Sequence, residues 1–309
     1  MNRVITFGRP LPPRPFVSSA PDWQQSSPRW IERALAIAKS RDCGGWHVVD
    51  TRRAVGAQPR RYRIDGNDIV FWRDGTELRA APDACPHLGA SLSAGCVRDG
   101  ELVCPWHGMR LGRSAHGSWK PLRTFDDGVL VWLQLPRPGE TGSIEPAITT
   151  RPERCIDATV RMEAICEPDD VIANRLDPWH GVHYHPHSFR RLNVVEKRED
   201  EITVRVAFGV LGPLSVEVDA RFHCPDARTI AMTIVAGDGQ GSVVETHATP
   251  VAPGRTAIIE TTLVTSDRAQ FSVALAAGAL LRPLIERAAA RLWVEDIAYA
   301  ERRYALRHG

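Results

Sequence analysis

The sequence has little net charge and lacks any run of basic residues interleaved with aromatic ones. Its 39 Lys and Arg nearly balance 37 Asp and Glu, which leaves a formal charge of +2. Nucleic-acid binding is therefore not expected, because it relies on a strongly basic surface. A hydrophobic fraction of 43% and a charged fraction of 25% are ordinary for a globular chain of 309 residues.

Long apolar segments are scarce as well. The longest, residues 271–285, is interrupted by Arg282 and Pro283 before it reaches the length of a membrane span. The first sixteen residues lack the apolar core and cleavage site of a secretory signal. We therefore expect a cytoplasmic protein. Contact of residues 273–281 with a membrane is the alternative to their packing as an ordinary helix.

Cysteine is present in an odd number, seven, in a chain without an export signal. A disulfide framework is therefore not expected. Paired cysteines in such a chain more often bind metal.

Short β-branched and aromatic runs separated by turn residues begin at Trp46 and predict a small all-β domain over residues 46–140. Residues 1–45 are expected to form a tail and a short helix that has Ser27 as its N-cap and Pro28 at its first position.

Longer strand patterns follow the Pro- and Gly-rich loop at residues 136–146. They fill the first part of residues 147–309, and a helical pattern from 269 to 307 comes last. This order predicts an antiparallel sheet followed by a long C-terminal helix, so the expected fold class of the chain is α+β.

Two pairs of metal-binding residue types lie close together in the first domain. Cys85 and His87 form one pair and Cys104 and His107 the other, with sixteen residues between them. Two thiolates and two imidazoles suit a [2Fe-2S] cluster in which histidines replace two cysteines on one iron. The same side chains could instead hold Zn²⁺, although this spacing is not that of a usual zinc finger.

The order and spacing of these four residues resemble a Rieske [2Fe-2S] domain. The resemblance implies that Cys85 and Cys104 bind one iron and that His87 and His107 bind the other. The additional cysteine pair of the respiratory-chain Rieske proteins is missing, so the ferredoxin-like and oxygenase branch is the more similar one. Cys96 is expected to be a small buried side chain.

A second motif gathers four of the chain's eleven histidines, which are His180, His183, His185 and His187. The Asp177-Pro178 pair predicts a helical turn that begins with Asp177 as its N-cap. His180 then belongs to the first turn and His185 to its frayed end, so both rings are expected to point to the same place. Surface histidines on a polar helix are the alternative.

An aspartate in the C-terminal helix completes a candidate iron site. Asp296 falls in line with the apolar positions Ile285, Leu292 and Tyr299, whereas Glu295 falls elsewhere and is expected in solvent. A carboxylate in an apolar stripe is costly unless it is paired or bound to metal. A salt bridge to a buried arginine is the alternative to an iron ligand.

These residues together resemble the catalytic half of the Rieske non-haem iron oxygenases, whose motif is N-x-x-D-x-x-H-x4-H followed by a distant aspartate. The resemblance implies that His180, His185 and Asp296 bind a mononuclear Fe(II), with His183 as the reserve ligand. It implies that Asp177 bridges an iron-ligand histidine to a cluster histidine of the neighbouring subunit. Asn174 is expected beside the iron as a weak or absent ligand.

The same resemblance implies a helix-grip catalytic domain and a homotrimer. A separate ferredoxin or flavin reductase is expected to deliver electrons from NAD(P)H, because the chain has no G-x-G-x-x-G fingerprint and no plant-type ferredoxin spacing. The expected activity is O₂-dependent oxidation of an apolar small molecule, with a monooxygenase favoured over a dioxygenase. Hydroxylation, desaturation, demethylation and cyclisation all remain open.

Three further stretches, residues 175–181, 244–250 and 298–307, are similar to a short actinobacterial group often associated with carotenoid genes. This likeness suggests an isoprenoid substrate. The alternative function is that of an electron carrier or an apolar-ligand-binding protein without a working mononuclear iron.

Overall fold

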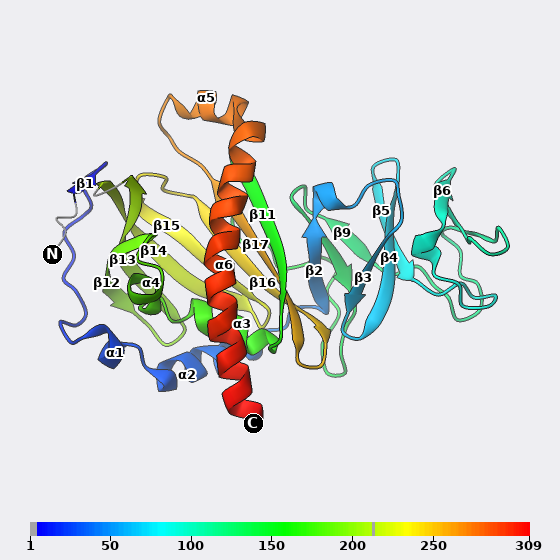
Figure 1. Cartoon of the computed structure of the whole chain (residues 1–309), viewed down its shortest axis with the longest axis horizontal. Helices are drawn as coiled ribbons and strands as arrows, with labels where there is room; N and C mark the ends of the chain where they lie inside the picture. The colour runs from blue at the N-terminus through cyan, green and yellow to red at the C-terminus, as the bar shows by residue number, and fades with distance from the viewer. Residues whose placement is uncertain (1–4, 212–213) are drawn as a thin grey trace.

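The computed structural model describes residues 5–211 and 214–309. Three small antiparallel sheets form the all-β part that carries the cysteine and histidine pairs (Figure 1). In sheet order their strands are β2 (Trp46–Thr51), β10 (Leu130–Gln134) and β9 (Thr124–Asp126); β3 (Arg60–Ile64), β4 (Asn67–Asp74) and β5 (Glu77–Pro82); and β6 (Cys96–Arg98), β7 (Glu101–Val103) and β8 (Arg110–Leu111). Two short 3₁₀ helices, η1 (Arg52–Ala54) and η2 (Leu92–Ala94), connect them.

Strand β4 is apolar on both faces because it divides two small cores. Ile69 and Phe71 pack into one core, and Val70 and Trp72 pack into the other. The alternation follows from the two-residue period of a strand. The second core also contains Cys85 and Cys104. The loops that carry these cysteines are therefore anchored to the same packed interior as the strand.

One eight-stranded sheet dominates the rest of the chain. Its order is β11 (Ile156–Ala164), β17 (Arg255–Val264), β16 (Val243–Ala252), β15 (Thr229–Gly237), β14 (Leu214–Asp226), β13 (Glu201–Leu211) and β12 (Phe189–Lys197), all antiparallel. Strand β1 (Ile5–Phe7) pairs with β14 in parallel. The antiparallel sheet expected from the sequence is thus confirmed.

A long helix, α6 (Gly278–His308), crosses one face of this sheet (Figure 1). The helical pattern predicted from residue 269 is divided, because a separate helix α5 (Phe271–Ala276) precedes it. Trp293 and Ala300 of α6 are buried in the main core, together with Val171 and Ile172 of α3 (Pro168–Arg175). Helix α6 and α3 are packed against each other, and this contact positions both of them over the sheet.

The N-terminal segment is more structured than the expected tail. It contributes β1 to the large sheet, forms the short helix α1 (Asp22–Gln25) and continues into α2 (Pro28–Lys39), whose N-cap is Ser27. Ile31 and Leu35 of α2 enter the main core. The proline-rich composition hid this packing, because a strand of three residues leaves almost no periodic signal.

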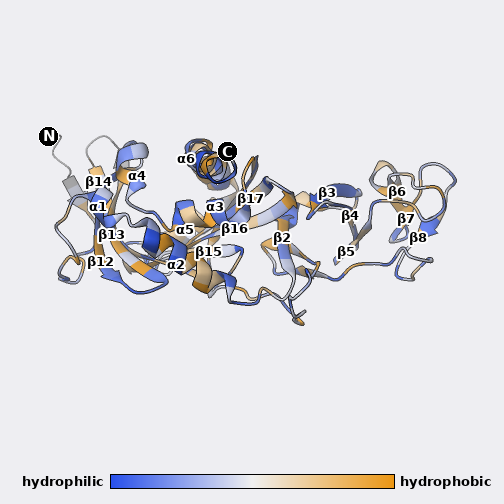
Figure 2. Ribbon diagram, turned by 90° about the horizontal axis from the view of Figure 1, so that it is seen from below, coloured by the Kyte–Doolittle hydropathy of each residue, from blue (hydrophilic) through white to orange (hydrophobic). Residues whose placement is uncertain are grey.

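The two functional regions lie far apart in the molecule. In both views the β6–β8 sheet occupies one end, whereas α4 (His180–Tyr184) and β12 lie toward the other, with α6 between them (Figures 1 and 2). In the described part of the chain, no helix is both long and apolar enough to span a bilayer.

Candidate metal centres

The two loops with the Cys and His pairs, residues 85–90 and 104–109, have matching backbones; we call them the cluster loops. In the first, the Cys85 amide donates to the carbonyl of Ala90 (2.8 Å) and the Gly89 amide donates to that of Cys85 (2.8 Å). In the second, Cys104 donates to Met109 (2.9 Å) and Gly108 to Cys104 (3.0 Å). Both glycines have positive φ, 77° and 72°, a conformation that glycine adopts at little cost.

The cluster loops bring all four predicted ligands together. Cys85 and Cys104 are buried and lie within contact of each other, whereas His87 and His107 are exposed, with ring centroids 4.9 Å apart. Burial raises the pKa of the Cys85 thiol. At Cys104 burial acts in the same direction, but the amides of Trp106 and His107 stabilise the thiolate and bring its pKa below the ordinary value.

The spread of these ligands fits two metal ions better than one. No three of the four ligand atoms in the cluster loops all lie within 4.8 Å of one another. Within residues 5–211 and 214–309, the one group that meets this condition lies outside the cluster loops. A tetrahedral Zn²⁺ site needs four ligand atoms around a single point. Two thiols on one side and two imidazoles on the other match the donor set of a Rieske cluster.

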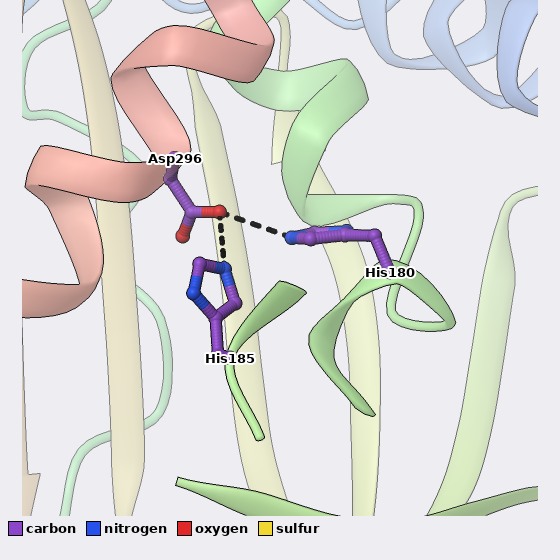
Figure 3. A group of neighbouring side chains, drawn as sticks. All are labelled: His180, His185 and Asp296. Carbon is purple, nitrogen blue, oxygen red and sulfur yellow. Dashed lines mark hydrogen bonds and ion pairs between the residues drawn. The ribbon is translucent and has the colours of Figure 1, made fainter. Parts of the chain in front are cut away.

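The converging group consists of His180, His185 and Asp296, which we call the metal triad (Figure 3). His180 begins α4, His185 lies directly after its end, and Asp296 projects from α6. Oδ1 of Asp296 is 3.0 Å from Nε2 of His180 and 2.8 Å from Nε2 of His185. His185 and Asp296 are buried, and the His180 side chain is 17% exposed.

The second nitrogen of each triad imidazole is also engaged. Nδ1 of His180 faces the backbone carbonyl of Asp177, and Nδ1 of His185 faces the carboxylate of Glu295. A neutral imidazole has only one N–H, so it cannot donate to oxygens from both nitrogens. A cation between the Nε2 atoms and Asp296 removes this conflict while Nδ1–H keeps its acceptor, which is the usual orientation of a metal-bound histidine. The residues therefore fit a metal ion.

The triad residues also shift one another's pKa. Burial alone raises the pKa of Asp296, but the hydrogen bonds to His180 and His185 outweigh it and hold that pKa well below its usual range. At His185 burial lowers the pKa, and the contacts with Asp296 and Glu295 more than compensate and raise it. The contacts with the two imidazoles thus favour the ionised form of Asp296.

Asn174 lies beside Asp296 in the same site. It is fully buried on α3, and its amide donates to Oδ1 of Asp296 (3.0 Å). Its own Oδ1 is buried without a hydrogen-bond partner among the described residues. An unpaired buried acceptor usually signals a missing water or ion, so Asn174 is available to whatever occupies the triad.

Asp177 does not cap the helix, contrary to the prediction. Helix α4 begins at His180 with Trp179 as its N-cap, and the Asp177 carboxylate instead accepts hydrogen bonds from Ser26 Oγ (2.9 Å) and Tyr299 OH (3.3 Å). Asp177 lines an open groove of about 670 Å³ that also contains Trp23 of α1. Because Ser26 and Tyr299 come from distant segments, the local sequence gave no sign of these partners.

The remaining histidines of the motif lie outside the triad. Nε2 of His183 pairs with Asp22 Oδ2 at 2.8 Å, and its side chain is 69% exposed, so the structure places the reserve ligand away from the site. His187 is 3.9 Å from Glu295. The expectation that Glu295 is simply solvated was wrong, because its carboxylate contacts His185. Nothing in the helical period of α6 distinguishes Glu295 from its solvated neighbours.

A cavity of about 230 Å³ opens beside the metal triad and lies between the large sheet and α6. All three triad residues and Asn174 line it, and most of the remaining wall is apolar, including Leu192, Val206, Phe222, Met232 and Leu292. A mostly apolar cavity with a few convergent polar groups is the common form of a small-molecule site.

Comparisons with known proteins agree with this geometry. Residues 45–126 match the Rieske [2Fe-2S] domain, and residues 137–309 match the family described as a domain of unknown function (DUF5914). The vanillate O-demethylase oxygenase subunit of Pseudomonas sp. strain HR199 is 45% identical over 69 residues, which are 22% of this chain and 19% of that protein. The 4beta-methylsterol monooxygenase of Methylococcus capsulatus is 43% identical over 67 residues, 21% of this chain and 18% of that protein.

These alignments span only about a fifth of the length of the two curated relatives. The structural likeness is broader. Dicamba monooxygenase bound to dicamba superimposes with a TM-score of 0.65 over 86% of this chain and 88% of that chain, at 18% identity, which shows a shared fold. The resemblance of the sequence to the Rieske non-haem iron oxygenases is therefore confirmed. The chain belongs to the DUF5914 family, with a Rieske [2Fe-2S] domain ahead of the family region and the architecture of a Rieske non-haem iron terminal oxygenase.

Proposed function

We propose that this protein is the terminal oxygenase component of a multi-protein oxidation system and that it oxidises an apolar small molecule with O₂. One observation carries the proposal: both imidazoles and the carboxylate of the metal triad converge beside an apolar cavity, with each Nδ1 already occupied by an oxygen. Two histidines and one carboxylate with open positions are the ligand set of non-haem Fe(II) oxygenases.

Each residue has a defined task in this proposal. Cys85 and Cys104 hold one iron of the [2Fe-2S] cluster, and His87 and His107 hold the other. His180, His185 and Asp296 hold the mononuclear Fe(II). When bound, these groups supply electrons and O₂ activation, respectively. The apolar wall of the cavity orients the substrate and excludes water from the triad.

We further propose that the subunits form a homotrimer and that Asp177 connects the two centres across a subunit boundary. The β6–β8 sheet beside the cluster loops lies at one end of the chain, and α4 and α6, which carry the triad, lie away from it (Figure 1), so we expect a neighbouring copy to bring the two kinds of centre together. Asp177 is 7% exposed at an open groove, next to the backbone contact that orients His180. The exposed His87 and His107 suit such an approach. A separate ferredoxin or reductase supplies the electrons.

A monooxygenase is favoured because the methylsterol and dicamba enzymes, which this chain resembles in sequence or in fold, are named monooxygenases. An isoprenoid or carotenoid-related substrate fits an apolar cavity. The volume of about 230 Å³ suits a small molecule or one end of a longer one. A location in the cytoplasm stays a prediction.

The second candidate is an electron carrier or apolar-ligand binder without mononuclear iron. The polar contacts of Asp296 favour this candidate. Asp296 accepts a hydrogen bond from Asn174 and contacts both triad imidazoles. Such a carboxylate can be satisfied without a metal if the imidazoles are protonated.

Iron and acid-labile sulfide analysis on anaerobically purified protein separates the two candidates. The oxygenase predicts about three irons and two sulfides per chain, and Asp296→Ala loses about one iron and no sulfide. Glu286→Ala is the matched control, because Glu286 is also on α6 but contacts Arg53 (3.8 Å) outside the site. About two irons in both the parent protein and Asp296→Ala would leave the carrier as the better description.

A further inference from the structure

The polar residues that line the cavity fall into two groups. One is the metal triad with Asn174. The other consists of Arg175, at the end of α3, and Glu260 and Thr262, which face the cavity from β17. Nothing in the proposed iron chemistry requires the second group. A partly buried arginine and a buried glutamate in an otherwise apolar wall are costly, so their presence needs a physical reason.

Glu260 is held firmly in place. It is 5% exposed, and its Oε2 accepts a hydrogen bond from Thr246 Oγ1 (3.1 Å), which lies opposite it on β16. Burial raises the pKa of Glu260, and the opposing effects of Arg175 and of the hydrogen bonds from Trp293 and Thr246 do not cancel this rise. The carboxylate is therefore a fixed hydrogen-bond acceptor on a rigid strand rather than a mobile surface group.

Arg175 is held less completely. Its side chain is 16% exposed, its Cζ lies 5.9 Å from the ring of Trp293, and its Nη2 is 3.5 Å from Glu260 Oε2. Across residues 5–211 and 214–309, this ion pair is the one polar side-chain contact recorded for Arg175. A guanidinium has five N–H donors, and 3.5 Å is too long for a strong hydrogen bond. Donors thus remain available in the cavity, beside an acceptor.

We propose that Arg175 and Glu260, which we call the polar pair, determine substrate specificity by binding a hydroxyl group on an otherwise apolar substrate. The hydroxyl oxygen accepts a hydrogen bond from Arg175, and the hydroxyl proton is donated to Glu260. This inference rests on the proposed function in one respect, namely that the cavity beside the triad is where the substrate binds.

The chemistry of the polar pair discriminates between related ligands. An alcohol or phenol satisfies both the donor and the acceptor. An ether or a ketone satisfies only Arg175, and a hydrocarbon leaves both charges without a new partner. A carboxylate gains Arg175 but has no proton to donate to Glu260. A site built to hydrogen-bond a hydroxyl strongly disfavours the analogue that lacks it, because the buried polar groups then stay unpaired.

The test is a binding measurement, because binding needs neither turnover nor a reductase. Isothermal titration of the purified chain would use two matched sets of probes: menthol, its methyl ether and p-menthane, and 1-naphthol, 1-methoxynaphthalene and naphthalene. We expect at least one alcohol to bind about tenfold or more tightly than its ether and its hydrocarbon. If neither alcohol is preferred, including the case in which no probe binds, the proposal is wrong.

The decisive variant is Arg175→Met/Glu260→Leu. Replacing both partners of a buried ion pair by apolar residues of similar size is often neutral for stability, so this protein should fold. Its preference for the alcohol should fall to within about twofold while hydrocarbon binding is kept. The matched control is Arg255→Met/Glu163→Leu, which removes an ion pair (3.0 Å) between two strands of the same sheet outside the cavity and should keep the preference.

Thr262→Val tests the competing explanation that the hydroxyl of Thr262, which also lines the cavity, binds the hydroxyl group of the ligand. Survival of the preference in Arg175→Met/Glu260→Leu, or its loss in Thr262→Val alone, would overturn the assignment to the polar pair. Iron content is measured on the same samples. A hydroxyl preference without mononuclear iron would refute the oxygenase while supporting the polar pair, so the two failures are distinguishable.

Discussion

The two candidate metal centres of this chain are built in opposite ways. The cluster loops place four ligands within 23 residues of sequence, on matching turns, with both histidines exposed at one end of the molecule. The metal triad joins residues that are up to 116 positions apart, between α4 and α6, and buries two of its three side chains. The difference is what the proposed function predicts: a group that accepts electrons must be reachable by a partner, whereas a site for O₂ chemistry has to exclude water.

This comparison predicts that the two centres are independent. The cluster loops depend on local backbone turns and a small core of their own, whereas the triad depends on how α6 crosses the large sheet. Removing a ligand from one centre should therefore leave the other centre loaded.

The largest expected effect is the loss of the cluster in Cys104→Ala. Without one thiolate the [2Fe-2S] cluster should not assemble, so the brown colour and both sulfides disappear while about one iron per chain remains at the triad. Visible absorption and iron and sulfide analysis measure this directly. Cys96→Ala is the control, because Cys96 lies on β6 and outside the cluster loops, and it should keep its colour.

If Cys104→Ala lost the triad iron together with the cluster, the two centres would not be independent. It would mean that the triad cannot load unless the Rieske part is intact. A normal cluster in this variant would show that Cys104 is not a ligand.

The same contrast explains what the sequence could and could not predict. Cys85, His87, Cys104 and His107 were identifiable because a local motif encodes a local structure. Asp296 was identifiable as a candidate ligand because it is a charged residue at an apolar position of one long helix. Four of the eight strands of the large sheet, β13, β14, β15 and β17, were recognised from runs rich in β-branched residues.

Contacts that depend on how separate elements pack could not be predicted. Whether Glu295 contacts His185 depends on the rotation of α6 relative to α4. The hydrophobic periodicity of each helix contains no information about that rotation. The hydrogen bond from Ser26 to Asp177 joins residues 151 positions apart and replaces the cap that the Asp-Pro pair suggested. The Arg175 and Glu260 pair likewise exists only once α3 lies on the sheet.

The second prediction concerns Asp177. Asp177→Asn should slow reoxidation of the reduced cluster by O₂ about 100-fold, and metal content should not change. The proposed bridge uses a charged carboxylate with two acceptor oxygens, whereas an amide is neutral and has only one acceptor oxygen. The relevant rate is the part of the reoxidation that Asp296→Ala abolishes, followed by visible absorption. Asp22→Asn, in the same groove, is the control and should react at the parent rate. An unchanged rate in Asp177→Asn would remove Asp177 from the path.

The third prediction concerns the orientation of His185. Glu295→Gln keeps the shape of the side chain but weakens the contact with Nδ1 of His185, so the triad should bind Fe(II) about tenfold more weakly. Competition with a chelator measures the affinity, and cluster absorption should stay the same. Glu286→Gln is the matched control on α6. Equal iron affinities in Glu295→Gln and the parent would show that the His185 ring is oriented by packing alone.

The smallest effect is expected for His183→Ala, two residues from a triad histidine. His183 is 69% exposed and its 2.8 Å contact is with Asp22 rather than Asp296. An exposed side-chain contact of this kind contributes at most about 1 kcal/mol, so thermal unfolding should change little and iron content should not change. Asp22→Asn should give a similar stability change, since it removes the same pair. A selective loss of triad iron in His183→Ala would reverse the assignment of His185, and the buried site would then have to reorganise around an exposed residue.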